Sequence, residues 1–178
     1  MAYKTIGMMR NGGMQKDIND HMASNGTLYL LAKERAKYLV TVSTYGRLLQ
    51  ENFLLNTAGG NGGAFIFVMD GDGAIYSASK AVVHHHSSFL AGGPVAAAGH
   101  WKVEYGKPTW ISNSSGHYAP PYDYAQQILD ELKKRGVDVT GITTEWTPGT
   151  AAQLSAIAKS RNVSFQRLGP KGVETSYF

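Results

Sequence analysis

The chain has 178 residues, of which 43% are hydrophobic and 17% charged, and 17 Lys and Arg against 13 Asp and Glu give it a net charge of +4. This composition excludes a disordered chain and is sufficient for one hydrophobic core. The complete absence of cysteine excludes disulfides, thiolate metal sites and cysteine nucleophiles. Since no apolar run reaches the roughly 20 residues of a membrane span, we expect a soluble, cytoplasmic protein with no membrane partner. The basic residues are scattered, which disfavours a nucleic acid polymer as partner.

The N-terminal part of the chain changes character twice. Residues 1–26 are polar and contain Gly and Met, which predicts a flexible arm ahead of a single domain over 27–178. A helical pattern over 27–37 is followed by the alternating, β-branched pattern of a strand over 38–43. A further short strand is predicted at 53–57.

Two β-hairpins are predicted in the middle of the chain. Residues 64–79 form the first, because the turn sequence Asp-Gly-Asp-Gly at 70–73 supplies the positive φ that a tight turn requires. We interpret Asp70 and Asp72 as turn residues, since a calcium loop needs further oxygen ligands and a closing Glu. The second hairpin spans 100–113 and turns at Gly106-Lys107.

The strongest helix signal follows the second hairpin. Pro121 lies near the predicted start, an apolar stripe runs along the helix, and a basic last turn ends at Gly136. A strand at 137–142, a helix at 151–160 and a strand at 163–168 complete the prediction. The order of elements predicts a single-domain α+β fold, built on an antiparallel β-meander with flanking helices.

Two segments carry an unusual concentration of imidazole, hydroxyl and glycine. Residues 84–99 place three histidines and two serines ahead of a Gly-Gly-Pro turn, and residues 114–121 bring two more serines, a glycine, a histidine and a tyrosine. Donor-rich side chains beside glycine backbone are typical of a lining for phosphate, and the second segment leads into a helix N-terminus. Glu104 is the only acid between Asp72 and Asp123, which also favours an anionic ligand.

The sequence therefore predicts binding, with sequestration as its role, of a phosphorylated small molecule such as a nucleotide, a cyclic nucleotide or an ADP-ribose-type ligand. Arg35 is included because a guanidinium binds phosphate with two donors. No metal or cofactor is expected, because three adjacent histidines on a strand place at most two on one face. The predicted ligand-binding residues are Arg35, His86, Ser87, Ser88, Gly92, Gly93, Ser115, Gly116, His117 and Tyr118.

Two alternatives remain open. An enzyme acting on NAD or on a nucleotide phosphodiester would use His86 and His117 as a paired acid and base near neutral pH. A protein-interaction inhibitor domain of effector type, with a host protein as partner, would use the same motifs to hold its loops in shape. In that case the buried hydroxyls and imidazoles satisfy loop backbone groups.

The segments HHSSFLAGGPVAAAG and ISNSSGHYAPP, with the hairpin between them, resemble a domain of plant IQ-motif calmodulin-binding proteins and of related bacterial effector- or toxin-like, phage and fungal sequences. The resemblance covers roughly residues 34–142 and implies the same fold and site. A small phage-like protein that binds such a phosphorylated ligand would sequester a host signalling nucleotide, which is an anti-defence role. It does not imply calmodulin as partner, because this chain lacks the IQ helix. His100 stands where many bacterial relatives have a carboxylate, so the resemblance leaves the reaction open. Matching positions are Glu34, Arg35, Tyr38, His86, Ser87, Ser88, Gly92, Gly93, Gly99, Gly116, His117 and Tyr118.

Overall fold

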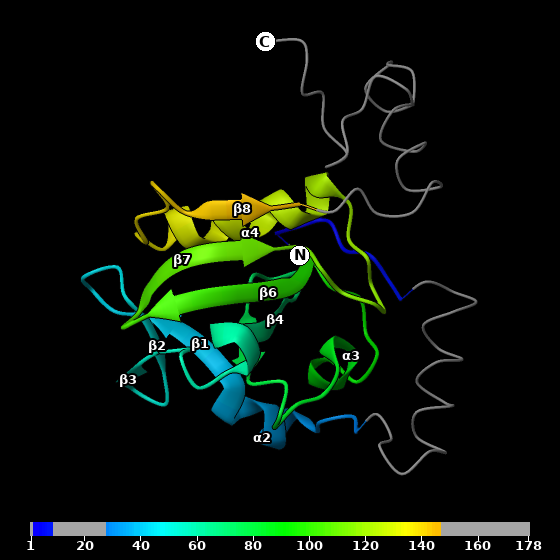
Figure 1. Cartoon of the computed structure of the whole chain (residues 1–178). Helices are drawn as coiled ribbons and strands as arrows, with labels where there is room; N and C mark the ends of the chain where they lie inside the picture. Colours follow the sequence, from blue (N-terminus) through cyan, green and yellow to red (C-terminus); the bar gives the residue numbers. More distant parts are fainter. Residues whose placement is uncertain (1, 9–27, 147–178) are drawn as a thin grey trace, which may run out of the picture.

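The computed structural model of the protein describes residues 2–8 and 28–146, which form one curled eight-stranded sheet with helices on both faces (Figure 1). The strand order is β3-β2-β1-β5-β4-β6-β7-β8. The predicted single-domain α+β fold is confirmed. The strand bounds are β1 (Leu39–Val42), β2 (Leu48–Gln50), β3 (Phe53–Leu54), β4 (Phe65–Met69), β5 (Ile75–Ala78), β6 (Ala97–Glu104), β7 (Lys107–Ser112) and β8 (Thr143–Glu145).

The strand pairs are antiparallel, with one exception among the described residues. The meander β1-β2-β3 forms one edge, and β1 then pairs with β5 of the next hairpin. Both predicted hairpins form, as β4-β5 and β6-β7, and β6 joins them by pairing with β4. The exception is β8, which runs parallel to β7 at the other edge.

The described helices are short apart from one. The predicted helix over 27–37 is reduced to one α-turn and one 3-10 turn, because Leu28 and Leu31 remain 70% and 61% exposed and bury no apolar stripe. The helix predicted after Pro121 forms and buries Ala125, Ile128 and Leu132. The helix bounds are α2 (Ala32–Arg35), η1 (Ala36–Tyr38), η2 (Asn61–Gly63), α3 (His86–Phe89) and α4 (Tyr122–Lys134).

The strand predicted at 137–142 is wrong, since the last described strand begins only at Thr143. The backbone turns first: the Asp138 Oδ1 atom accepts hydrogen bonds from the Thr140 amide at 2.9 Å and hydroxyl at 2.6 Å, and Gly141 has a φ of +74°. This local side-chain bonding competes with strand pairing. The helix and strand predicted at 151–160 and 163–168 lie outside the described residues.

Two apolar cores pack against the two faces of the sheet. Alternation along β4 sends Phe67 and Met69 to the core that α4 covers, and Ile66 and Val68 to the core that contains Phe89 of α3. Because β4 is buried on both faces, its sequence FIFVM is continuously apolar rather than alternating.

Residues 2–8 lie against the sheet and α4, within the segment predicted to be a flexible arm. Ile6 pairs with Val95, and the Tyr3 hydroxyl donates to the Glu131 Oε2 atom at 2.6 Å. Burial and this hydrogen bond raise the pKa of Tyr3 to about 12. Burial acts to raise the pKa of Glu131, but the hydrogen bonds from Tyr3 and Arg135 outweigh it and hold that pKa below its usual value. The boundary at residue 26 stays a prediction, because residues 9–27 are not described.

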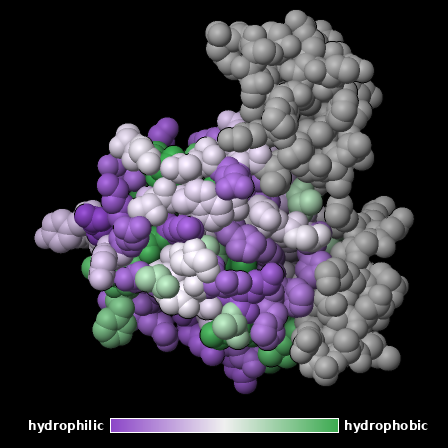
Figure 2. All heavy atoms as spheres, in the orientation of Figure 1, coloured by the Kyte–Doolittle hydropathy of each residue, from purple (hydrophilic) through white to green (hydrophobic). Residues whose placement is uncertain are grey.

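Backbone hydrogen bonds outside the strand ladder curl the sheet. The Leu48 amide donates to the Gly106 carbonyl oxygen at 2.9 Å, the Gly106 amide to Leu55 at 2.7 Å, and the Thr57 amide to Val103 at 2.9 Å. The β6–β7 tip at Gly106 therefore lies against the start of β2 and the residue that follows β3. Figure 2 shows hydrophobic atoms interrupting a mostly polar surface toward its lower edge, over the region of α2 and the β2–β3 hairpin in Figure 1. We call the exposed side chains at the tips the hairpin-tip patch: Tyr45, Phe53, Leu54 and Tyr105.

Candidate functional site

The two His/Ser/Gly segments meet beside α3. The Ser87 Oγ and His117 Nδ1 atoms are 3.1 Å apart, and the ring centroids of His85 and His117 are 5.2 Å apart. The Tyr118 hydroxyl donates to the Gly93 carbonyl oxygen at 2.7 Å. The structure thus brings together side chains that lie 30 positions apart in the sequence. We call these contacts, together with the hydrogen bond between His86 and Gly99, the motif network.

His86 joins α3 to the centre of the sheet. Its Nε2 atom lies 2.8 Å from the Gly99 carbonyl oxygen in β6, and since a carbonyl only accepts, Nε2 carries the proton. Burial lowers the pKa of His86 to about 3, so the ring is neutral at pH 7. A neutral imidazole whose N–H is bonded to the backbone does not act as a cationic ligand for phosphate.

His100 on β6, which was not among the predicted ligand-binding residues, is a second imidazole beside His86 of α3. Its Nδ1 atom donates to the Ser114 carbonyl oxygen at 3.0 Å, and its ring lies 5.3 Å from that of His86 in an edge-on contact. Burial lowers the pKa of His100 as well. The amide of Asn113, also missed, is buried and donates to the Pro120 carbonyl oxygen at 2.9 Å. The signals available for these two residues were the acid-poor composition around them, the position of His100 relative to the bacterial relatives, and the place of Asn113 within the second motif.

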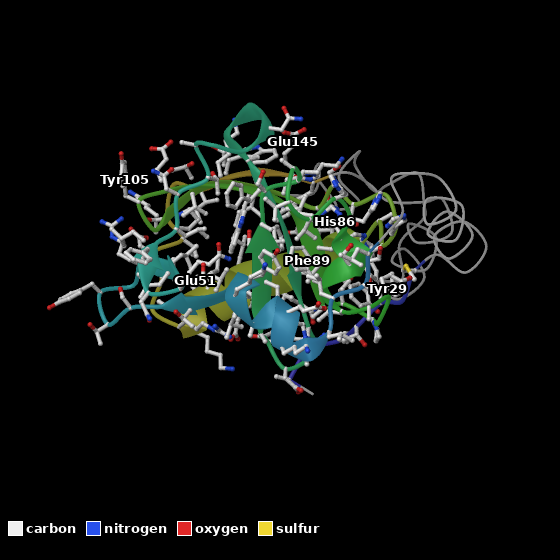
Figure 3. The ribbon with its side chains drawn as sticks, turned by 90° about the horizontal axis from the view of Figure 1, so that it is seen from below. Tyr29, Glu51, His86, Phe89, Tyr105 and Glu145 are labelled. Atoms are coloured by element: carbon white, nitrogen blue, oxygen red, sulfur yellow. The ribbon has the colours of Figure 1, made fainter. Side chains whose placement is uncertain are left out.

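Arg35 holds α2 against α3. Its Nη1 atom donates to the Phe89 carbonyl oxygen at 3.2 Å, and its guanidinium lies 5.7 Å from the centroid of the Tyr76 ring. The Ser88 carbonyl oxygen accepts from the Leu30 amide at 3.0 Å. Figure 3 shows Phe89 of α3 close to the blue ribbon of α2. Arg35 and Ser88 therefore connect the segment that contains α2 to α3.

The remaining predicted residues shape the two loops. Gly92 has a φ of +78°, and its amide donates to the Ser87 carbonyl oxygen at 2.8 Å, while a Cβ at Gly93 would lie 2.9 Å from the Leu90 carbonyl oxygen. The Ser115 carbonyl oxygen accepts from the Ala119 amide at 2.8 Å. Gly116 is exposed, and no atom lies within 4 Å of the position that a Cβ would take. Most of these residues therefore set the backbone conformation of the two loops or hydrogen-bond within it.

Burial separates the motif network from solvent. Ser87 is 0% exposed, His117 3%, Ser88 3% and His86 7%. The Ser87–His117 contact has the geometry of a nucleophile and its base, but a substrate cannot reach a fully buried hydroxyl in this arrangement. Nothing in the structure tests His86 and His117 as catalytic residues, so that role stays a prediction. Within residues 2–8 and 28–146, no three or more His, Asp or Glu side chains are grouped to hold a metal ion.

We expect Tyr118→Phe to lower the free energy of unfolding by about 1–2 kcal/mol, because the Gly93 carbonyl oxygen loses its hydroxyl donor. Urea denaturation followed by circular dichroism measures the change. The matched control is Tyr105→Phe, whose side chain is 71% exposed and whose stability should stay within about 0.5 kcal/mol of wild type. Equal stabilities of the two variants would contradict the role given to the Tyr118 hydroxyl.

The fold and the site define the class of this protein. It is an α+β domain in which a buried network of His and Ser side chains connects α3, β6 and the loop before α4. The model of the IQ motif-containing protein middle domain matches residues 34–125, just over half of the chain. The chain belongs to this family. The resemblance to plant IQ-motif proteins found in the sequence is thereby confirmed.

The relatives are plant proteins that are much longer than this chain. The IQ domain-containing protein IQM3 of Arabidopsis thaliana is 32% identical over 139 residues, which cover 74% of this chain and 30% of that protein. The IQ domain-containing protein IQM1 of the same plant is 29% identical over 138 residues, covering 77% of this chain and 28% of that protein. The chain thus spans less than a third of the length of either relative. No solved structure matches the chain.

The predicted binding of a phosphorylated small molecule is wrong, and so are the nucleotide-binding, effector-like, phage-like and anti-defence roles attached to it. The family is that of IQ motif-containing proteins, and the relatives are IQ domain-containing proteins of Arabidopsis thaliana rather than nucleotide-binding or phage proteins. The physical reason lies in the direction of the donors. The His86 Nε2 atom and the Arg35 Nη1 atom donate to backbone carbonyl oxygens rather than into an open site.

Within the described part of the chain, no helix is both long and apolar enough to cross a membrane.

Proposed function

We propose that this chain is a protein-interaction domain, in which the motif network holds the loops in shape and the exposed surface contacts a protein partner. The observation that carries this proposal is the burial of the motif side chains together with their internal hydrogen bonds. His86 donates to Gly99, Ser87 contacts His117, and Tyr118 donates to Gly93. A ligand at these residues would have to replace bonds that the fold already makes.

The surface supports the same proposal. Eight large hydrophobic side chains are at least 40% exposed on the described part of the molecule. Exposed hydrophobic side chains that gather into patches mark protein contacts more often than small-molecule sites. Membership of a family of IQ motif-containing proteins adds independent support. The interaction is therefore assigned to the surface rather than to the motif network.

We expect Ser87→Ala to lower the free energy of unfolding by about 1–3 kcal/mol, because it removes the partner of the buried His117 Nδ1 atom. Thermal and urea denaturation measure the loss. Ser114→Ala is the matched control from the same motif, since the Ser114 side chain is exposed and should change stability by no more than about 0.5 kcal/mol.

Capture of partner proteins by the immobilised chain tests the function, with Ser87→Ala assayed at a temperature where circular dichroism shows it folded. We expect folded Ser87→Ala to capture as much partner as wild type. Substitution of exposed apolar side chains, either Leu31 and Val82 together or Phe53 and Tyr105 together, should reduce capture in at least one of the two variants. The proposal fails if folded Ser87→Ala loses capture and both surface variants keep it, because the motif itself would then be the binding site.

A further inference from the structure

Two segments beside α3 carry most of the net charge of the protein. Residues 28–38 and 79–86 together contain four basic side chains and one acidic side chain, a net charge of +3 out of +4 for the whole chain. The intervening α3 and the loop that follows it, 87–95, contain no charged residue. We call the larger exposed side chains of the two segments the α2 surface: Leu28, Tyr29, Leu31, Lys33, Glu34, Lys37, Lys80, Val82 and His84.

Contacts with α3 place the two segments together. Leu30 from the first segment and Val83 from the second are buried in the same apolar core as Phe89. Arg35 in the first segment donates to the Phe89 carbonyl oxygen at 3.2 Å. Lys80 in the second segment lies close enough for its charge to act on His86. The side chains of both segments therefore surround α3.

Within the described residues, the positive charge of the α2 surface is not neutralised from within the protein. Its single acid, Glu34, accepts a hydrogen bond from the Leu31 amide at 2.7 Å and so caps the N-terminus of α2. The described ion pairs join Glu131 to Lys134 and Arg135 on α4, across the sheet. Lys33, Lys37 and Lys80 are exposed, so a partner can supply negative charge to the α2 surface at a low desolvation cost.

The α2 surface also offers apolar contact between its lysines. Leu28, Leu31 and Val82 are 70%, 61% and 63% exposed. Apolar side chains surrounded by charged ones are typical of a protein interface with a hydrophobic centre and a polar rim. A free anion such as phosphate would use the lysines alone, whereas a partner segment with both acidic and apolar side chains uses the whole surface.

We propose that the α2 surface binds an acidic, amphipathic segment of a partner protein. The proposal rests on the function proposed above and names the surface and the chemistry of the partner. The hairpin-tip patch is also apolar, but equal numbers of basic and acidic side chains surround it. It therefore favours neither an acidic nor a basic partner segment. Those side chains are Arg47, Lys102 and Lys107 against Glu51, Glu104 and Asp138.

Fluorescence anisotropy with the full chain tests the proposal. The probe is a synthetic labelled peptide with Leu at helical i, i+3, i+4 and i+7 spacing and Glu or Asp at the other positions. The control probe has Lys in place of every acid. We expect wild type to bind the acidic probe in preference to the basic one. Raising the salt concentration from about 0.05 M to about 0.5 M should weaken that binding.

Matched variants assign the binding to a surface. Lys33→Glu, Lys37→Glu and Lys80→Glu combined should weaken binding of the acidic probe about tenfold or more, because each exposed charge contact contributes a modest and roughly additive amount. Tyr45→Ser and Tyr105→Ser combined should leave it within about twofold of wild type, since the hairpin-tip patch lies apart from the α2 surface. Circular dichroism is used to check that both variants are folded before their binding is compared.

The outcomes distinguish the surface from the function. The α2 surface assignment is overturned if wild type fails to bind the acidic probe, if the two probes bind alike, or if charge reversal leaves binding unchanged. The capture assay with the same variants then shows whether the interaction function itself still holds. If the hairpin-tip variant loses partner capture and the charge-reversed variant keeps it, the interaction function stands and only the surface was misplaced. Loss of capture by the charge-reversed variant alone supports both proposals.

Discussion

Gly99→Ala is expected to destabilise the fold by about 3–5 kcal/mol, at the upper end of what one added methyl group costs in a packed interior. A Cβ at Gly99 in β6 would overlap the carbonyl oxygen of Ser112 in β7, and it would lie 2.8 Å from the Ser112 carbonyl carbon and 3.0 Å from the Asn113 Cα atom. All three atoms are backbone, so no side chain can rotate away. Relief requires the β6-β7 pair to separate, which also displaces the acceptor of His86.

Gly116→Ala is the matched control, because it adds the same methyl group to the second motif where no atom lies within 4 Å. Its free energy of unfolding should stay within about 0.5 kcal/mol of wild type. Urea denaturation at pH 7 compares the two variants, and the soluble yield reports on Gly99→Ala if it does not fold. Similar stabilities would mean that β6 and β7 do not approach as closely at Gly99 as the structure shows.

Local signals were sufficient to predict the elements that depend on their own residues. The first hairpin turn follows from Asp70, whose Oδ1 atom accepts from the Asp72 and Ala74 amides, and from Gly73 with a φ of +91°. The helix α4 ends at Lys134 and is followed, as predicted, by Gly136, whose φ of +83° stops the helical backbone. In both places the geometry is specified within a few residues of sequence.

Elements that depend on distant partners were missed. The helix α3 is one turn long and buried throughout, so it has no amphipathic period to detect. The strand β8 exists through parallel pairing with β7, more than 30 positions earlier. Neither feature has a local signal in the sequence.

The same limit explains the mistaken function. Composition shows that a segment is rich in donors, but it does not show whether those donors face a ligand or the protein itself. Ser87 and His117 lie in the two motifs identified in the sequence, but the meeting of these motifs and the burial of both side chains became known only from the fold. A His/Ser/Gly motif without carboxylates is compatible both with ligand binding and with a structural role in the loops. The direction of its hydrogen bonds decides between the two.

The stability of the fold is expected to fall by about 2 kcal/mol between pH 7 and pH 5 because of His86 alone. In the unfolded chain His86 binds a proton near its ordinary pKa of about 6.5. Burial lowers its pKa in the fold to about 3. At pH 7 the ring is neutral in the fold and mostly neutral in the unfolded chain, so it contributes little pH dependence there. As the pH falls below about 6.5, only the unfolded state gains the proton, so the fold loses stability steadily until the pH reaches the folded-state pKa.

His86→Gln separates this effect from the other titrating groups. The glutamine amide can donate to the Gly99 carbonyl oxygen, but it does not titrate, so the difference in unfolding free energy between pH 7 and pH 5 should shrink by about 2 kcal/mol. His84→Gln, at an exposed position in the same run, should keep the wild-type difference. Carboxylates with lowered pKa values, such as Glu131, lose their stabilising effect only as the pH falls further, toward about 4 and below. If His86→Gln keeps the wild-type pH dependence, His86 is not held neutral by the fold, and the motif network would have to accommodate a charge at its centre.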